Sequence, residues 1–146
     1  MASFMDMALS EARAAGAAGE VPVGCVIVRG GTVVARAGNR TLGDGDPTAH
    51  AELLAIRAAA ASLGSERLTE CDLYVTLEPC PMCAAATAFA RIRRLYYGAA
   101  DPKGGAVESG VRFFASPTCH HHPEIYGGMA AAEAAALLKE FFKERR

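Results

Sequence analysis

Apolar residues recur at helical spacing near the beginning of the chain, with charged residues between them. A spacing of three and four residues places such side chains on one face of a helix. The pattern therefore predicts an amphipathic first helix, which ends in the region from Gly16 to Gly19. Its apolar positions are Phe4, Met5, Ala8, Leu9, Ala12 and Ala15.

Short runs of β-branched and other apolar residues predict strands, and the pair Gly30-Gly31 predicts a hairpin turn between the first two of them. The predicted strands are residues 21–28, 33–36, 72–77, 94–97 and 124–126. Further helices are predicted at about residues 50–63, 80–90 and 130–145. A helix that connects two strands of one sheet usually makes a crossover, so this order predicts a mixed sheet with helices packed on its faces. Ligands of such sheets bind at the carboxyl ends of the parallel strands.

The composition indicates one soluble globular domain, residues 1–146, since 51% of the chain is hydrophobic. The formal net charge is −1, so any contact with RNA would have to come from local basic clusters. No apolar run approaches the length of a membrane span, and no basic segment followed by an apolar one opens the chain. The five cysteines, an odd number, argue against a disulfide scaffold. We therefore expect a cytoplasmic protein that does not associate with a membrane.

Two short segments, Thr48-Ala49-His50-Ala51-Glu52 and Glu78-Pro79-Cys80-Pro81-Met82-Cys83, carry the candidate chemistry. Zn²⁺ prefers tetrahedral nitrogen and sulfur coordination, and a catalytic zinc site usually has three protein ligands and one open position. We therefore predict that His50, Cys80 and Cys83 bind zinc. Glu52 is then predicted to act beside the metal, as the group that carries protons between water and the substrate.

The spacing also predicts that these residues lie at the beginnings of two helices. Pro81 is favoured at the first helical position, and the partial positive charge of a helix N-terminus favours thiolates at Cys80 and Cys83. His50 and Glu52 are two residues apart, so they can face one ion only over the end of their helix. The alternatives are a structural zinc site, or a Cys-x-x-Cys redox pair beside a core histidine. The paired segments, in this order, favour the catalytic site.

Two other clusters allow more than one interpretation. Cys119 and the adjacent residues His120, His121 and His122 could bind a second metal, but adjacent histidines point in different directions, which favours a loop that contacts the substrate or a neighbouring subunit. Near the C-terminus, Phe141 and Phe142 could pack in the core, or they could stack on an unpaired base while nearby basic residues contact phosphates. Composition alone favours core packing.

With these residues placed, the chain resembles the cytidine deaminase superfamily and, within it, the bacterial tRNA-specific adenosine deaminases. The two zinc segments mark the superfamily. The loop around Lys103, residues 101–106, and the double phenylalanine of the last helix point to the tRNA branch. After Gly105 the chain departs from the usual family pattern, with Val107 to Phe114 and then the histidine cluster. The matching segments outside the zinc motif are Glu20-Val21-Pro22-Val23-Gly24, Gly38-Asn39-Arg40, Leu73 to Leu77, Tyr97-Gly98-Ala99, Asp101 to Ala106 and Phe141-Phe142.

The resemblance implies a three-layer α/β/α fold of the cytidine deaminase type with a five-stranded mixed sheet. It implies a single zinc-dependent deaminase domain over residues 1–146, one Zn²⁺ per subunit and a homodimer. The implied reaction is hydrolytic: the first, or wobble, adenosine of a transfer RNA anticodon becomes inosine and ammonia is released. The implied partner is the anticodon loop, whose unpaired bases are easily flipped.

The resemblance also implies roles for individual residues. His50, Cys80 and Cys83 would bind zinc, and Glu52 would be the catalytic proton shuttle. Asn39 would hydrogen-bond the flipped base, and Val23 would line its pocket. The remaining substrate contacts would be Phe141 and Phe142 at the anticodon loop, with Lys103 and Arg145 near phosphates. For at least one of the two phenylalanines, the resemblance favours stacking over core packing.

The sequence also admits two other functions. A deaminase of a free base or nucleoside, such as guanine or cytosine, would need a closed pocket and would have no use for an exposed aromatic and basic last helix. A zinc-stabilised RNA-binding module without catalysis would not need a carboxylate such as Glu52 beside the metal. Both features favour the tRNA deaminase.

Overall fold

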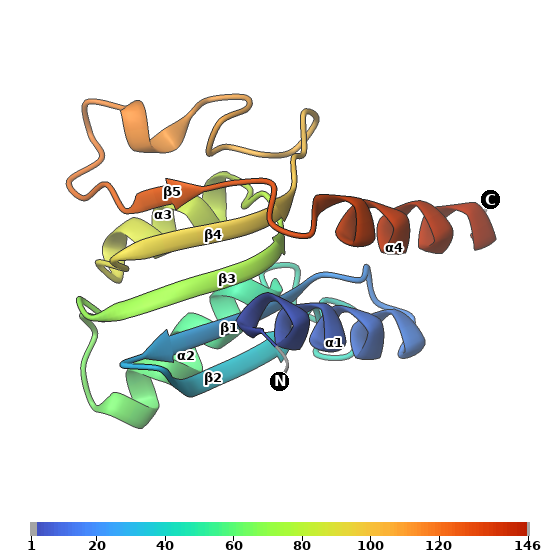
Figure 1. Cartoon of the computed structure of the whole chain (residues 1–146), viewed down its shortest axis with the longest axis horizontal. Helices are drawn as coiled ribbons and strands as arrows, with labels where there is room; N and C mark the ends of the chain where they lie inside the picture. The colour runs from blue at the N-terminus through green and yellow to red at the C-terminus, as the bar shows by residue number, and fades with distance from the viewer. Residues whose placement is uncertain (1–2, 146) are drawn as a thin grey trace.

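The computed structural model describes residues 3–145, which contain four α-helices, one 3-10 turn and five strands (Figure 1). The helices are α1 (Phe4–Ala17), α2 (Ala51–Leu63), α3 (Pro81–Phe89) and α4 (Ala131–Glu144), and the 3-10 turn is η1 (Phe113–Ala115). The strands are β1 (Gly24–Arg29), β2 (Thr32–Gly38), β3 (Cys71–Leu77), β4 (Arg94–Ala99) and β5 (Glu124–Tyr126). Every predicted helix and strand is present.

The strands form one mixed sheet in the order β2-β1-β3-β4-β5. β1 is antiparallel to both of its neighbours, β2 and β3, whereas β3, β4 and β5 are parallel to one another. The predicted hairpin turn is confirmed, since Gly30 and Gly31 both have positive φ, at 54° and 78°. The parallel crossover from β3 through α3 to β4 is confirmed as well. It brings the carboxyl ends of β3 and β4 to one edge of the sheet.

The prediction was wrong at the beginning of the first strand, which begins at Gly24 and not at Val21. Pro22 has no N–H to donate to a neighbouring strand, and the N–H of Val23 donates to the carbonyl of Val21 within the same segment. The chain therefore turns before it joins the sheet. This irregular segment matters because Val21 and Val23 lie beside the candidate site.

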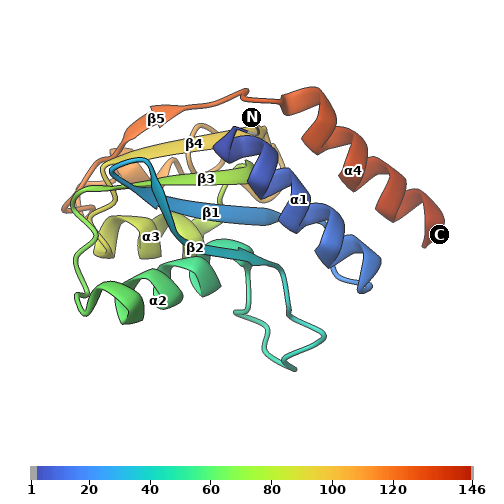
Figure 2. The same cartoon turned by 60° about the horizontal axis from the view of Figure 1, so that its bottom comes forward.

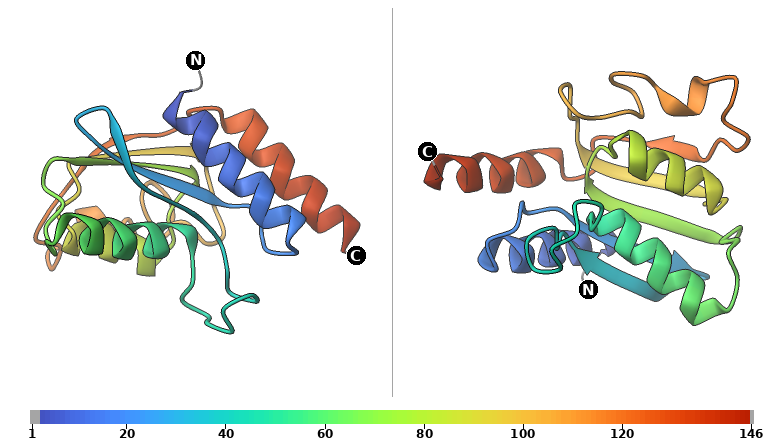
Figure 3. Two further views of the ribbon diagram at one scale, coloured as in Figure 1. Left: turned by 90° about the horizontal axis from the view of Figure 1, so that it is seen from below. Right: turned by 180° about the vertical axis from the view of Figure 1, so that it is seen from behind.

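The helices cover both faces of the sheet. α2 and α3 lie on one face, and α1 and α4 lie on the other (Figure 2). α1 and α4 are side by side, and both extend beyond the end of the sheet (Figure 3). The predicted three-layer α/β/α fold is therefore confirmed. None of the described helices combines the length and the apolar character that a bilayer crossing requires.

Candidate metal centre

Two helix N-termini meet at the candidate metal centre. His50 is the residue immediately before α2, and its extended backbone, with φ −78° and ψ 150°, turns the chain into the helix. Cys80 takes the same place before α3, Pro81 occupies the first turn, and Cys83 follows within that turn. The predicted placement at the beginnings of two helices is confirmed. β3 delivers the chain directly to Cys80, so the sheet fixes where the sulfur atoms lie.

The three ligand side chains have separations that suit zinc. The Nδ1 atom of His50 lies 3.6 Å from Sγ of Cys80 and 3.6 Å from Sγ of Cys83. Tetrahedral geometry with ordinary zinc bond lengths puts a nitrogen and a sulfur ligand about 3.6 Å apart. All three ligand atoms lie within 4.8 Å of one another, and this is the one such group of histidine, cysteine and acidic residues in the part of the chain described. The residues therefore fit the metal that the sequence predicts.

The electrostatics of the free site also favour a cation. Hydrogen bonds from Cys83 and from His50 lower the pKa of the Cys80 thiol to about 4, although partial burial opposes this shift. The hydrogen bond to Cys80, together with burial, raises the pKa of Cys83. The hydrogen bond with Cys80 also raises the pKa of His50. Cys80 is therefore a thiolate at neutral pH, and a metal ion would displace the remaining protons of the site.

Glu52 lies in the first turn of α2, and only 4% of its surface is exposed. Burial raises the pKa of this carboxyl to about 7. A group with a pKa near neutrality can both accept and release a proton, which general acid–base catalysis requires. Glu52 lines the same cavity as His50 and Cys80, so it faces the space where a substrate would lie.

The cavity beside these residues has a volume of about 270 Å³. It brings together five of the residues that the sequence singled out, namely Val23, Asn39, His50, Glu52 and Cys80. Its other walls come from the irregular segment before β1, the loop after β2, the end of β3 and the loop after β4, through Val21, Thr41, Leu77, Glu78, Asp101 and Gly104. The lining therefore combines the apolar side chains of Val21, Val23 and Leu77 with a larger set of polar groups, which can orient a small ligand or a base.

Asn39 has a structural contact that the sequence did not predict. Its Oδ1 atom accepts a hydrogen bond of 2.8 Å from the N–H of Ala51, the first residue of α2. His50 makes no side-chain hydrogen bond to the helix, so Asn39 caps the helix in its place. The amide group of Asn39 can still donate hydrogen bonds into the cavity.

Four predicted substrate contacts do not line this cavity. Lys103 is exposed and is next to Gly104, which does line it.

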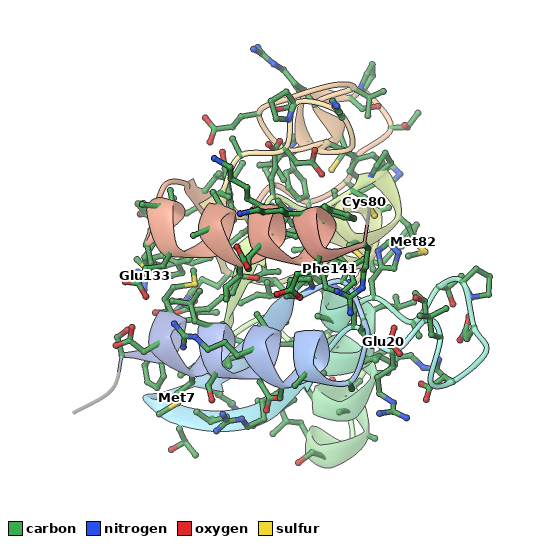
Figure 4. The ribbon with its side chains drawn as sticks, turned by 90° about the vertical axis from the view of Figure 1, so that its right-hand side faces the viewer. Met7, Glu20, Cys80, Met82, Glu133 and Phe141 are labelled. Carbon is green, nitrogen blue, oxygen red and sulfur yellow. The ribbon has the colours of Figure 1, made fainter. Side chains whose placement is uncertain are left out.

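Phe141 is only 9% exposed, and the guanidinium of Arg145 lies over its ring at 3.6 Å. Phe142 is 50% exposed. Figure 4 shows Phe141 on the same side of the molecule as Cys80 and Met82. Core packing therefore describes Phe141, and Phe142 is the ring that is free to stack; whether either contacts RNA stays a prediction.

The histidine cluster packs against the turn before β4. The thiol of Cys119 donates to the carbonyl of His121 at 3.1 Å, and Nε2 of His121 donates to the carbonyl of Ile92 at 2.7 Å. The ring of His121 therefore attaches this loop to the turn before β4, and the Cys119 thiol makes a contact within the loop.

Sequence reasoning missed two buried carboxylates, Glu78 at the wall of the cavity and Glu20 behind it, where Glu20 accepts a hydrogen bond from the hydroxyl of the wall residue Thr41. Glu20 accepts hydrogen bonds from the N–H groups of Leu42 and Gly43, at 3.1 and 2.7 Å, in the loop after β2. Glu78 makes similar contacts with the loop after β4. Both residues were within matching segments, but only their burial beside a loop shows what they do.

Comparison with known proteins agrees with this site. The family model described as the cytidine and deoxycytidylate deaminase zinc-binding region matches residues 1–99. A tRNA-specific adenosine deaminase of Agrobacterium fabrum is 64% identical over 143 residues, which cover 98% of this chain and 94% of the relative. The chain belongs to the tRNA-specific adenosine deaminase family. The predicted family is therefore confirmed.

Solved structures show how widely this deaminase fold is shared. A structure from studies of A-to-I editing by tRNA:A34 deaminases at the wobble position of transfer RNA has a TM-score of 0.91 and 65% identity, and the match covers 92% of this chain and 98% of that one. A guanine deaminase of Bacillus subtilis has a TM-score of 0.66 and 34% identity, with 97% and 91% covered. The adenosine deaminase and the free-base deaminase therefore share one framework. The difference between their substrates must come from details of the site.

Proposed function

We propose that this protein is a zinc-dependent hydrolase that converts the wobble adenosine of a transfer RNA to inosine and releases ammonia. The observation that carries the proposal is a buried Glu52 beside His50, Cys80 and Cys83, whose ligand atoms have separations that suit zinc. The chain is also 64% identical to a tRNA-specific adenosine deaminase. One zinc ion per subunit, held by these three ligands, would supply Lewis-acid activation of water.

Glu52 is the proton carrier of this proposal. Its carboxylate would take a proton from the attacking water and deliver it to the ring nitrogen next to the reacting carbon of adenine. It would then assist protonation of the leaving ammonia. The pKa of about 7 that burial gives this group suits both directions of transfer. Asn39 would donate a hydrogen bond to the base, and Val23 would pack against it, since both line the cavity.

Contacts with the anticodon loop would come from exposed residues around the cavity. Lys103 would meet a phosphate, and Phe142 would stack on an unpaired base near Arg145. A net charge of −1 makes such local contacts more important than bulk attraction. We further propose that residues 1–146 act as a single domain, as a homodimer and in the cytoplasm. The exposed Phe89 at the end of the alanine-rich α3 supports a partner contact there.

The test is inosine formation on an anticodon stem-loop with adenosine at the first position, with free adenosine, cytidine and guanine assayed in parallel. The wild-type protein should act on the stem-loop and not on the free compounds, and Glu52→Gln should keep its zinc and lose the activity. The structural likeness to a guanine deaminase makes free guanine the second candidate substrate. Turnover of guanine with an untouched stem-loop would replace the first proposal by the second.

A further inference from the structure

Glu78 is the most completely hydrogen-bonded carboxylate beside the cavity, and the proposed reaction does not use it. It follows β3 directly, two residues before Cys80, and 2% of its surface is exposed. Oε2 accepts the N–H groups of Val107, Glu108 and Ser109 at 3.0, 2.9 and 2.9 Å. Oε1 accepts the N–H of Asp101 and the hydroxyl of Ser109, each at 2.9 Å. Five donors from one loop therefore surround a single side chain.

The loop Asp101–Ser109 is folded around this carboxylate. At Gly105, a Cβ atom would lie 2.5 Å from Cδ of Glu78, so only glycine lets the backbone approach this closely. The N–H of Ala106 donates to the carbonyl of Pro79 at 2.8 Å. The side chain of Asp101 in turn accepts the N–H groups of Lys103 and Gly104, at 3.2 and 3.0 Å. The position of Lys103 thus depends on Asp101, and that of Asp101 depends on Glu78.

The same loop forms part of the cavity wall. Asp101 and Gly104 line the cavity together with Glu78, and Lys103 is exposed between them. A loop that is already ordered loses less conformational entropy when a ligand binds, so it contributes more of its contacts to affinity. A buried carboxylate that holds five donors is a means of ordering a short loop that has few apolar side chains of its own.

We propose that Glu78 is a positioning residue for the RNA substrate. Its carboxylate fixes the loop Asp101–Ser109 as a preformed wall of the cavity and so holds Lys103 where it meets a phosphate beside the flipped nucleotide. This inference rests on the proposed function, because it concerns how the same site binds its RNA.

Glu78→Gln is the variant that tests the contact. The amide oxygen can still accept the three N–H groups of residues 107–109, but the amide nitrogen then faces the N–H of Asp101, a second donor. The variant therefore loses the contact to Asp101 and should keep the overall fold. Asp72→Asn is the matched control, since Asp72 is a carboxylate of 8% exposure at the other end of β3, where it pairs with Arg93 at 2.9 Å.

Zinc content, amide hydrogen exchange and steady-state kinetics are measured on the zinc-loaded proteins with the stem-loop substrate. In Glu78→Gln, exchange within residues 101–109 should rise about tenfold, as the loss of one charge-assisted hydrogen bond implies. KM should rise by about the same factor, with a smaller change in kcat and an unchanged zinc content. Asp72→Asn should leave both the exchange of the loop and KM at the wild-type values.

A double-mutant cycle with Lys103→Ala tests whether Glu78 acts through the lysine. If it does, the KM of the double variant should be close to that of the more impaired single variant. Independent effects would instead multiply, so that the KM of the double variant would rise by the product of the two single factors. Ser109→Ala is a milder second variant, which removes one of the five donors and leaves Glu78 in place. It should shift exchange and KM in the same direction by a smaller factor.

Several results would overturn the inference. An active Glu78→Gln protein with wild-type exchange and KM would do so, as would a loss of zinc with an unchanged KM for the zinc-loaded fraction, which would assign Glu78 to the metal centre instead. Multiplying effects in the double-mutant cycle would remove the role of Lys103. If the wild-type protein itself leaves the stem-loop untouched, the proposed function falls and this inference falls with it. The two failures are therefore told apart before any variant is compared.

Discussion

Asn39→Ala should lower both the stability and the activity of the protein, whereas Asn39→Asp should lower the activity alone. Oδ1 of Asn39 accepts the N–H of Ala51 at 2.8 Å, at the N-terminus of α2 between the proposed zinc ligand His50 and the proposed proton carrier Glu52. Alanine removes this acceptor and leaves a helix N–H without its partner. Aspartate keeps an oxygen in the same place, and its negative charge suits the positive end of the helix.

The size of each effect follows from the contacts that are lost. Loss of a capping acceptor costs about 1 to 2 kcal/mol, so Asn39→Ala should lower Tm by roughly 3 to 8 °C in a chain of this size. Both variants lose the amide donor proposed to contact the base, which should cost about 1.5 kcal/mol, or roughly tenfold in kcat/KM. The alanine variant should lose more activity than this, because the beginning of α2 also carries Glu52.

Thermal unfolding of the zinc-loaded proteins and inosine formation on the stem-loop measure the two effects. Asn39→Asp should have a Tm at or above that of the wild type, together with a kcat/KM reduced by at least tenfold. An aspartate variant as unstable as the alanine variant would show that Oδ1 does not cap the helix. An aspartate variant with wild-type activity would show that the amide group does not contact the base.

Three further outcomes are expected. Phe142→Ala should weaken binding of the stem-loop by roughly 5- to 100-fold, the value of one stacked base, with little change in Tm. Phe141→Ala should instead lower Tm, because that ring is only 9% exposed. Binding assays and thermal unfolding measure the two effects, and equal effects of both variants on Tm would contradict the assignment. Removal of zinc by a chelator should abolish inosine formation and lower Tm, and added Zn²⁺ should restore both; an active, metal-free protein would exclude the proposed role of the metal. Glu20→Gln should increase amide exchange at Leu42 and Gly43, whose N–H groups its carboxylate accepts, and leave zinc content unchanged; unaltered exchange there would mean that the loop is held by other contacts.

The parts of the site that the sequence predicted depend on local structure. Cys80 lies at a helix N-terminus because Pro81 and the preceding strand act within a few residues along the chain. Helical periodicity also separates Phe141 from Phe142, since Ala134, Leu138 and Phe141 fall on one face. This pattern could have identified Phe141 as the packed ring before the structure was known.

The contacts that were missed join residues far apart in sequence. Asn39 meets the N–H of Ala51, Glu20 meets the loop after β2, and Glu78 meets Val107 across 29 residues. Every residue except proline has a backbone N–H, so the partner of such a carboxylate leaves no mark in the sequence. Only the folded chain shows which loop each acidic side chain holds. The beginning of β1 was misplaced for a related reason, because Pro22 affects strand pairing and not the apolar pattern.

The division between chemistry and recognition follows from the same contacts. The sheet and the two helix N-termini position the proposed metal ligands and Glu52, and the fold is shared with a guanine deaminase. The residues that select a substrate are therefore expected outside this framework, in the two cavity loops held by Glu20 and Glu78 and at the exposed end of α4, which does not line the cavity. Each of the two loops is attached to the framework by a carboxylate that can be replaced without changing a proposed zinc ligand. Substitutions in these loops should accordingly change which substrate binds while the zinc content stays constant. Substitutions of His50, Cys80 or Cys83 should instead lower the zinc content.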